Sequence, residues 1–280
     1  MNTGLQSFSL EGKAVLITGA AGLLGTQHAI ALAETGAMVF LSDIDEEGLK
    51  KAKATVTKFS IVDPEIVVMD ITCEESIILA KEIVVQKSKQ RNHVFKSLVN
   101  NAAVDHKVAE NGIAKSMRLE DFDVEGWNKE VSVGLTGAVL CAKHFGPLLL
   151  ESGAGIILNI SSDLSVFSPD QRLYEKTGLS DSQQPVKSVS YPVIKTGLLG
   201  LTRYLATYWK NSNVRCNALS PGGVFVDQDE DFVQRLSNLI PLNRMATRDE
   251  YRAAVQFLCS DASSYMNGQN IVIDGGRSVL

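Results

Sequence analysis

Short apolar runs alternate with longer amphipathic stretches along the whole chain. An apolar run of four to eight residues is typical of a strand buried on both faces, and a longer stretch with helical periodicity is typical of a helix. We therefore expect strands at 14–18, 37–43, 65–70, 96–102, 155–161, 214–221 and 270–276. We expect helices at 23–35, 46–58, 74–90, 121–150, 189–210 and 248–260.

This alternation predicts an α/β fold, a Rossmann-type doubly wound parallel sheet with helices on both faces. The chain contains no internal repeat, low-complexity tract or linker, so residues 1–280 are expected to form a single domain. Residues 163–190 depart from the pattern, because they carry mixed charges and show no periodicity. A loop of this length in a compact domain is either functional or disordered.

Composition argues against several classes of protein. Hydrophobic residues make up 45% of the chain and charged residues 21%, as in globular proteins. The net charge is −5 and no basic stripe is present, so nucleic acid is not an expected partner. The chain begins without a secretory signal pattern, and Lys143, His144 and Pro147 interrupt the apolar run at 131–150. We therefore expect a cytoplasmic protein without membrane contact.

The cysteines and histidines are too scattered to suggest a metal site. Zinc sites usually draw on Cys and His residues at short, regular spacings. The cysteines lack such spacing and are expected to be free thiols in a reducing compartment. They are Cys73, Cys141, Cys216 and Cys259, and the histidines are His28, His93, His106 and His144. No bound metal is predicted.

A glycine-rich turn follows the first predicted strand. Gly19, Gly22 and Gly25 are spaced by three and open the first helix, where the backbone of Leu23 and Leu24 is also expected to take part. Glycines let the backbone turn tightly and approach a pyrophosphate, and the helix N-terminus supplies free N–H groups. Glycine also serves plain turns, but the position between an N-terminal strand and a helix favours dinucleotide binding.

Asp43 ends the second predicted strand, 18 residues after Gly25. A carboxylate there can accept hydrogen bonds from the adenosine ribose and would repel a 2′-phosphate. No Lys or Arg lies in the loop at 18–25 to hold such a phosphate, so NAD is favoured over NADP. Asp43 could instead cap the next helix. Asp70, after the third strand, could reach the adenine or cap the helix that follows it.

Seven motifs, in order, resemble those of the short-chain dehydrogenase/reductase family. They are TGAAGLLG (18–25), Asp43, NNAA (100–103), NISS (159–162), YPVIK (191–195), SPGG (220–223) and DGG (274–276). Each is modest alone, but together they cover nearly the whole chain. The resemblance implies an enzyme that interconverts an alcohol and a ketone with a nicotinamide cofactor.

The resemblance assigns catalysis to Ser162, Tyr191 and Lys195. Tyrosine is a weak base at neutral pH because its hydroxyl stays protonated. Tyr191 and Lys195 are four residues apart on one face of a helix, so the Lys195 ammonium can stabilise the phenolate. Tyr191 would exchange a proton with the substrate oxygen while a hydride moves to or from the nicotinamide. Ser162 would hydrogen-bond the same oxygen.

The same resemblance implies the remaining contacts. The cofactor would touch Asp70, Ile71, Asn101, Ala102, Ala103, Tyr191, Lys195, Pro221, Gly222 and Val224, besides the glycine turn and Asp43. The substrate would touch Ser162, Asp163, Gln171, Arg172, Tyr191 and Gly223. Simpler roles stay open, because Gly222 and Gly223 could form an ordinary turn and Asn100 could only tie strands together.

Three features depart from the family pattern. Leu23 stands at the usual middle glycine, with Gly22 one position earlier. Gly134 replaces an asparagine that holds a water in the family's proton relay, so the relay is expected to differ. Ser162 and Tyr191 are 29 residues apart, farther than in many relatives. The extra residues must enter and leave at the mouth of the active site, and we predict that they line the substrate pocket rather than form a solvated surface loop.

This insertion, Gly134 and the stretches SPGGVF and SSYMNGQNIVIDGGRS resemble a narrower group, the oxidoreductases of flagellin modification and nonulosonic-acid metabolism. That resemblance implies a carbohydrate substrate. The alternatives are an acyl or polyol substrate, and a catalytically silent NAD-binding redox sensor. Family members assemble through long helices, here about 125–150 and 189–210, so a homodimer or homotetramer is expected.

Overall fold

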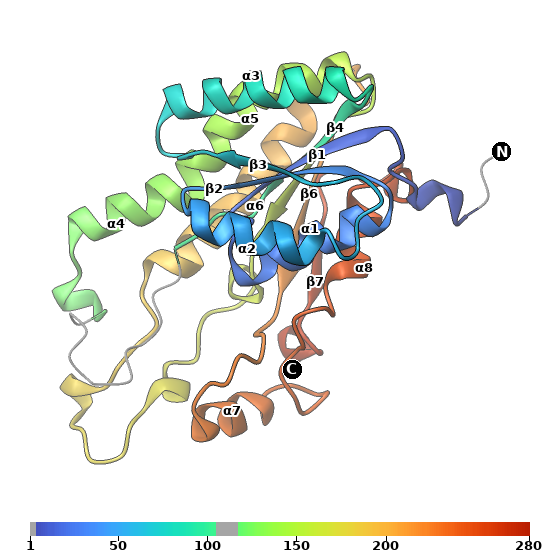
Figure 1. The fold of residues 1–280 in the computed structure, drawn as a ribbon. Helices are drawn as coiled ribbons and strands as arrows, with labels where there is room; N and C mark the ends of the chain where they lie inside the picture. Colours follow the sequence, from blue (N-terminus) through green and yellow to red (C-terminus); the bar gives the residue numbers. More distant parts are fainter. Residues whose placement is uncertain (1–3, 105–116) are drawn as a thin grey trace.

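A computed structural model describes residues 4–104 and 117–280 of the protein. Seven strands form one parallel sheet in the order β3-β2-β1-β4-β5-β6-β7, which confirms the predicted doubly wound fold (Figure 1). The strands are β1 (Lys13–Thr18), β2 (Met38–Asp43), β3 (Glu65–Val68), β4 (Val94–Asn100), β5 (Ile156–Ile160), β6 (Arg215–Pro221) and β7 (Asn270–Ile273). The helices are α1 (Leu23–Glu34), α2 (Glu46–Val56), α3 (Glu74–Gln90), α4 (Val124–Val131), α5 (Gly137–Glu151), α6 (Ser190–Tyr208), α7 (Glu230–Ser237) and α8 (Arg252–Leu258).

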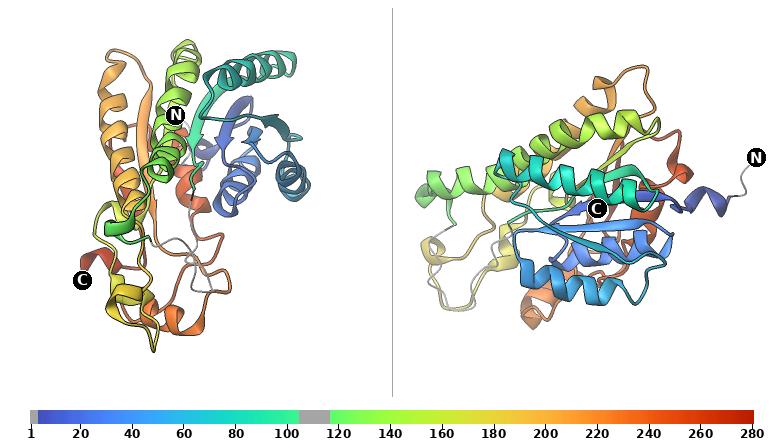
Figure 2. Two further views of the ribbon diagram at one scale, coloured as in Figure 1. Left: turned by 90° about the vertical axis from the view of Figure 1, so that its left-hand side faces the viewer. Right: turned by 45° about the horizontal axis from the view of Figure 1, so that its top comes forward.

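Helices cover both faces of the sheet (Figures 1 and 2). α1, α2 and α8 pack on one face and contribute Ile30, Leu49 and Val255 to a buried apolar cluster. α3, α5 and α6 pack on the other face, and a second cluster there includes Phe145 and Leu205. Strands that are buried on both faces explain why the apolar runs were continuous rather than alternating.

The helix predicted at 121–150 is interrupted in the structure. α4 and α5 are joined by a π-helical segment, Ser132–Thr136, and π turns of this kind often mark functional sites. By length and composition alone the stretch Val124–Glu151 could cross a membrane. Cys141 and Phe145 of α5 are nevertheless fully buried in the core, as expected for the core helix of a globular protein.

The stretch 163–190 contains three short 3-10 helices, Asp163–Ser165, Gln171–Tyr174 and Asp181–Gln183. Leu173 packs in a small apolar cluster with Leu236 of α7. Figure 2 shows this stretch and α7 projecting from the same end of the sheet. The stretch is therefore anchored by its own contacts rather than only by its two ends.

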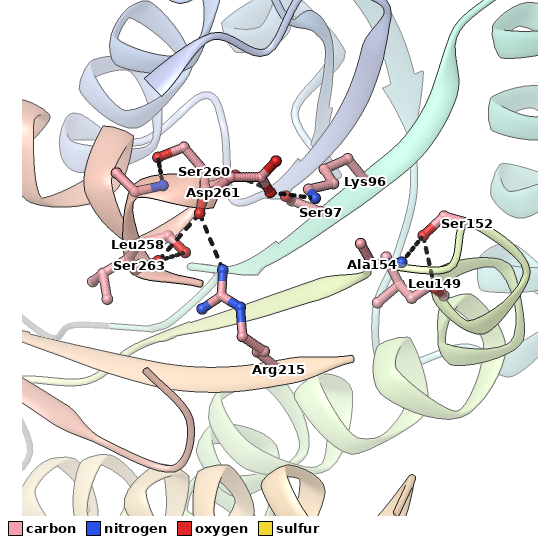
Figure 3. Close-up of polar contacts among 12 residues, drawn as sticks. Lys96, Ser97, Leu149, Ser152, Ala154, Arg215, Leu258, Ser260, Asp261 and Ser263 are labelled. Carbon is pink, nitrogen blue, oxygen red and sulfur yellow. Dashed lines mark hydrogen bonds and ion pairs between the residues drawn. The ribbon is translucent and has the colours of Figure 1, made fainter. Parts of the chain in front are cut away.

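A polar cluster joins the segment after α8, which holds Ser260 and Asp261, to the amino ends of β4 and β6 (Figure 3). The Lys96 Nζ on β4 donates to the Asp261 Oδ1 at 2.8 Å, and only 7% of the Lys96 side chain is exposed. Arg215 on β6 donates to the carbonyls of Ser260 and Met266. This edge lies away from the carboxyl ends of the strands, so we assign these contacts a role in stabilising the fold.

The carboxyl ends of the strands meet on the other edge of the sheet. β1 lies between β2 and β4, so the direction of strand order reverses at that point. In open α/β sheets, ligands bind outside the carboxyl ends of the strands at such a switch point. The residues that end β1, β2, β4, β5 and β6 are Thr18, Asp43, Asn100, Ile160 and Pro221.

Candidate active site

The glycine turn after β1 can be built only with glycine at two positions. Gly19 has a φ of +65°, and a Cβ there would lie 2.7 Å from the Ala102 Cα. A Cβ on Gly25 would lie 2.1 Å from the Gly19 carbonyl oxygen. Gly22 is the N-cap of α1 and provides no side-chain cap, so the N–H groups of the first turn, including those of Leu23 and Leu24, are left for another acceptor. This arrangement suits a pyrophosphate.

Asn101, just after β4, holds the glycine turn in place. Its Nδ2 donates to the carbonyls of Thr18 and Gly19, each at 3.0 Å. The Thr18 hydroxyl in turn accepts from the backbone N–H groups of Asn101 and Ala102, each at 3.1 Å. Asn101 and Ala102 therefore shape the cradle, and Ala103 follows as an exposed residue at its rim.

The Asp43 carboxylate lies beside the glycine turn. Its Oδ2 accepts from the Ala21 N–H at 3.1 Å, and its Oδ1 accepts from the Asp45 N–H at 3.2 Å. The N-cap of α2 is Asp45, whose Oδ1 accepts from the Gly48 N–H. A carboxylate has about four lone-pair positions, so two engaged positions leave capacity for ribose hydroxyls.

Asp70 and Ile71 follow β3 near the same edge. The Asp70 Oδ1 accepts from the backbone N–H and the hydroxyl of Thr72, and Asp70 is not the N-cap of α3, which is Cys73. Ile71 is buried against Gly137, where a Cβ would lie 2.7 Å from the Ile71 Cδ1. Its side chain therefore belongs to the core.

Tyr191, Lys195 and the end of β5 are brought together by α6. The Lys195 Nζ donates to the Ile160 carbonyl at 2.8 Å, and the Ser161 hydroxyl donates to the Lys195 carbonyl at 2.7 Å. Lys195 is buried, with its Nζ 5.8 Å from the centroid of the Tyr191 ring. Ser162 follows Ser161 directly, and the 3-10 helix Asp163–Ser165 after it packs against α6.

This combination of a glycine cradle and a Ser, Tyr and Lys set matches a known family. The family model described as enoyl-(acyl carrier protein) reductase matches residues 19–278. The chain belongs to the short-chain dehydrogenase/reductase family. It is therefore an oxidoreductase, and its relatives use nicotinamide cofactors.

Three similar proteins illustrate the range of this short-chain dehydrogenase/reductase family. The NAD-dependent glycerol dehydrogenase of Listeria innocua is 29% identical and covers 98% of this chain and 97% of its own. The 3-oxoacyl-[acyl-carrier-protein] reductase FabG of Thermotoga maritima is 32% identical and covers 95% and 98%. A solved structure from Beutenbergia cavernae, provisionally described as an NAD(P)-dependent gluconate 5-dehydrogenase with NADP at low occupancy, is 28% identical, with a TM-score of 0.80 and coverage of 98% and 100%.

The loop after β6 closes one side of the site in this dehydrogenase/reductase. The Gly222 N–H donates to the Ile273 carbonyl, and the Gly222 carbonyl accepts from the Tyr251 hydroxyl at 2.9 Å. Burial raises the pKa of Tyr251, so this phenol stays a donor. Val224 forms an isolated bridge with Ala246. Contacts with Ile273, Tyr251 and Ala246 therefore hold this loop, which consists of Pro221, Gly222, Gly223 and Val224, in one conformation.

Two predicted substrate residues serve the insertion itself in this structure. The Gln171 side chain bonds both the N–H and the carbonyl of Lys187. Arg172 pairs with Asp170 at 2.7 Å, and its side chain is 80% exposed. The cation that does approach the catalytic set is Lys187, whose Nζ lies 4.1 Å from the centroid of the Tyr191 ring. Sequence reasoning missed Lys187, because the spacing of residues in an irregular loop does not predict which of them approach Tyr191.

Ser162 is hydrogen-bonded to its neighbour Asp163. The Ser162 hydroxyl donates to the Asp163 Oδ1 at 2.9 Å, and Asp163 is buried. Burial raises the pKa of Asp163, while Ser162 and the guanidinium of Arg277 oppose that rise. The predicted substrate residue Asp163 therefore faces Ser162 and Arg277, and Arg277 is a second residue that sequence reasoning missed.

Gly134 lies in the π-helical segment and packs against α6. A Cβ on Gly134 would lie 2.6 Å from the Ile194 Cγ2, so an asparagine does not fit without movement of Ile194. Position 134 therefore offers no side chain that could hold a water, as the departure from the family pattern led us to expect. Among the described residues, no three His, Cys, Asp or Glu side chains come together to hold a metal ion.

Proposed function

We propose that the protein is an NAD-dependent dehydrogenase that interconverts the hydroxyl and keto forms of a polyol or sugar-like substrate. The observation that carries this proposal is the pair of hydrogen bonds that join α6 to the end of β5, one from Lys195 and one from Ser161. These bonds bring a buried ammonium, a phenol and a serine hydroxyl to the carboxyl edge of the sheet. That edge also carries the glycine cradle.

In the oxidising direction, Tyr191 accepts the proton of the substrate hydroxyl. The positive charges of Lys195 and Lys187, at 5.8 Å and 4.1 Å from the ring centroid, favour the phenolate that this step requires. Ser162 fixes the substrate oxygen beside Tyr191. The bound nicotinamide supplies the hydride acceptor, which is chemistry that no side chain provides.

The residues of the cradle fit NAD better than NADP. The uncapped first turn of α1 suits a pyrophosphate, and the Asp43 carboxylate suits two ribose hydroxyls. A 2′-phosphate would meet the negative charge of Asp43. We expect the cofactor to lie along the carboxyl edge, over Asn101–Ala103, and to reach Pro221, Gly222 and Val224 with its nicotinamide end.

The insertion supports a polar substrate. Residues 163–190 are rich in hydroxyl, amide and charged side chains, and the Lys187 Nζ lies 4.1 Å from the centroid of the Tyr191 ring. Similar proteins include a glycerol dehydrogenase and a structure provisionally described as a gluconate 5-dehydrogenase. Within that class we favour a carbohydrate, in line with the resemblance to the flagellin-modification and nonulosonic-acid oxidoreductases. Gln171, Arg172 and Gly223 stay our predicted substrate contacts, with Gln171 and Arg172 also bonded within the insertion.

A reductase for acyl thioesters is the second candidate, because FabG of Thermotoga maritima is 32% identical. The polar insertion argues against a long acyl chain. A silent redox sensor is a weaker candidate still, since a sensor has no need of an intact set of Ser162, Tyr191 and Lys195.

We also propose that residues 1–280 form one domain that works in the cytoplasm as a homodimer or homotetramer. The outer faces of α5 and α6 expose Val139 and Tyr204, which are 44% and 60% exposed. Burial of such apolar side chains would stabilise an assembly.

The test is initial-rate absorbance at 340 nm with NAD⁺ or NADP⁺ against glycerol, threitol, gluconate, amino sugars and sugar phosphates. Reduction of acetoacetyl thioesters with NADH or NADPH is measured in parallel. The proposal predicts turnover of at least one polyol or sugar with NAD⁺. Turnover of the thioester alone would favour the acyl reductase, and no turnover with measurable NADH binding would favour the sensor.

A further inference from the structure

The hydroxyl of Ser162 is fixed at two points. It donates to the Asp163 Oδ1 at 2.9 Å and accepts from the Leu164 N–H at 3.2 Å. A serine hydroxyl has one proton and two lone pairs, so these bonds leave a single direction for a third partner. Ser162 is also buried, so its side chain does not rotate in bulk solvent.

Asp163 is a buried charge with three partners. Its Oδ1 accepts from Ser162 and from the Leu164 N–H at 2.8 Å, and its Oδ2 lies 3.4 Å from the Arg277 Nη1. Only 7% of its side chain is exposed. A buried carboxylate that loses its cation becomes costly and relaxes or takes up a proton.

Arg277 reaches this position from the far end of the chain. Its side chain is 10% exposed, and its guanidinium carbon lies 4.7 Å from the centroid of the Phe167 ring. The turn that presents Arg277 has Gly276 at a φ of +94°, and the Asp274 carboxylate accepts from the N–H groups of Gly276 and Ser278. A side chain held by such a turn is preorganised.

We propose that Arg277 and Asp163 are a buried positioning pair for the Ser162 hydroxyl, so that the turn 274–278 near the C-terminus is part of the active site. The inference rests on the proposed hydride transfer, because Ser162 must meet the substrate oxygen. An ionised Asp163 accepts the hydrogen bond from the Ser162 hydroxyl and holds the Ser162 oxygen in place for the substrate, whereas a protonated Asp163 becomes a donor there and releases the hydroxyl from that position. The pair therefore decides which way the serine hydroxyl points.

Charged and titratable groups face the pair from every packed element. Arg277 and Asp274 come from the turn after β7, and Tyr251 comes from the start of α8. On α6, the Lys195 Nζ donates to the carbonyl of Ile160, two residues before Ser162, and lies 5.8 Å from the centroid of the Tyr191 ring. Removal of Arg277 takes away the charge that opposes the burial effect, so the pKa of Asp163 rises.

The experiment compares Arg277→Met, Arg277→Lys and Asp163→Asn in the full-length enzyme. Arg277→Met keeps an apolar stem against Phe167 and removes the charge. The matched control is Arg244→Met, which breaks an exposed pair with Glu250 at 2.6 Å. For each variant, kcat, KM, the pH profile of kcat, the NADH Kd and the melting temperature are measured. A crystal structure of Arg277→Met reports the position of the Ser162 side chain.

We expect Arg277→Met to lower kcat roughly 10- to 100-fold, as expected for a misplaced reacting partner, with the NADH Kd unchanged. The limb of the pH profile that Asp163 controls should move to higher pH in Arg277→Met and vanish in Asp163→Asn. Arg277→Lys should recover part of kcat, Arg244→Met should behave as wild type, and Ser162 should leave its position in the Arg277→Met crystal.

The inference is overturned if Arg277→Met keeps the wild-type kcat and pH profile, or if the Ser162 side chain keeps its place in the crystal. If Arg277→Met does not fold, Asp163→Asn decides in the same way, because it keeps an acceptor for Leu164. A wild-type enzyme without turnover would refute the proposed function instead, and the crystal would still decide on the positioning pair.

Discussion

The choice between NAD and NADP depends on the charge of Asp43, and Asp43→Asn should weaken that choice. A hydrogen bond to a charged group contributes about 1.5–3 kcal/mol and a neutral one about 1 kcal/mol, so loss of the charge should weaken NAD⁺ binding about tenfold. Two unit charges 4 Å apart repel by about 1 kcal/mol in water and about 4 kcal/mol at a dielectric constant near 20. Relief of that repulsion should strengthen NADP⁺ binding by about tenfold or more.

The assay is the ratio of kcat/KM for NAD⁺ and NADP⁺ at 340 nm with a fixed substrate. We expect the ratio to fall about 100-fold in Asp43→Asn, from the two effects above. Asp45→Asn is the control, because Asp45 lies two residues away, caps α2 and faces Gly48 rather than the glycine turn. An unchanged ratio in Asp43→Asn, or the same change in Asp45→Asn, would refute the reasoning.

Three further predictions concern stability and thiol reactivity. Asp261→Asn removes the negative charge that faces buried Lys96 and should lower the free energy of unfolding by about 1–2 kcal/mol in urea titrations. Lys96→Met should cost less, and equal losses would contradict this account of the pair. Burial lowers the pKa of His28 to about 4, below the unfolded value near 6.5. Because the unfolded state alone takes up this proton between those values, stability should fall by about 2 kcal/mol from pH 7 to pH 5, and His28→Leu should flatten that dependence. Burial raises the pKa of Cys141, Cys216 and Cys259 to about 12 while Cys73 is partly exposed, so iodoacetamide at pH 8 should label Cys73 alone by mass spectrometry.

The sheet could be predicted from sequence because strands covered on both faces leave continuous apolar runs. The run at 14–18 became β1, and the predicted helix at 74–90 coincides with α3. α7 is absent from the sequence prediction because it has only eight residues and little apolar character. The π-helical break at Ser132–Thr136 depends on packing of Gly134 against Ile194, which periodicity does not report.

The candidate site also contains residues that the sequence predicted and residues that it did not. Ser162, Tyr191 and Lys195 were predicted because they stand in short motifs that resemble those of the family. Arg277 meets Asp163 across 114 residues, a contact that only the tertiary fold creates. Arg172 was a reasonable candidate by charge alone, yet its charge is engaged by Asp170, two residues away.

The proposal that Tyr191 transfers the proton is tested most directly by Tyr191→Phe, with kcat and the NADH Kd measured side by side. Phenylalanine keeps the ring that packs beneath Lys187 and removes only the hydroxyl. A positioned acid–base group contributes about 10²- to 10⁴-fold, so kcat should fall by about 10³-fold while the NADH Kd stays within about twofold. A variant that keeps the wild-type kcat would contradict the account.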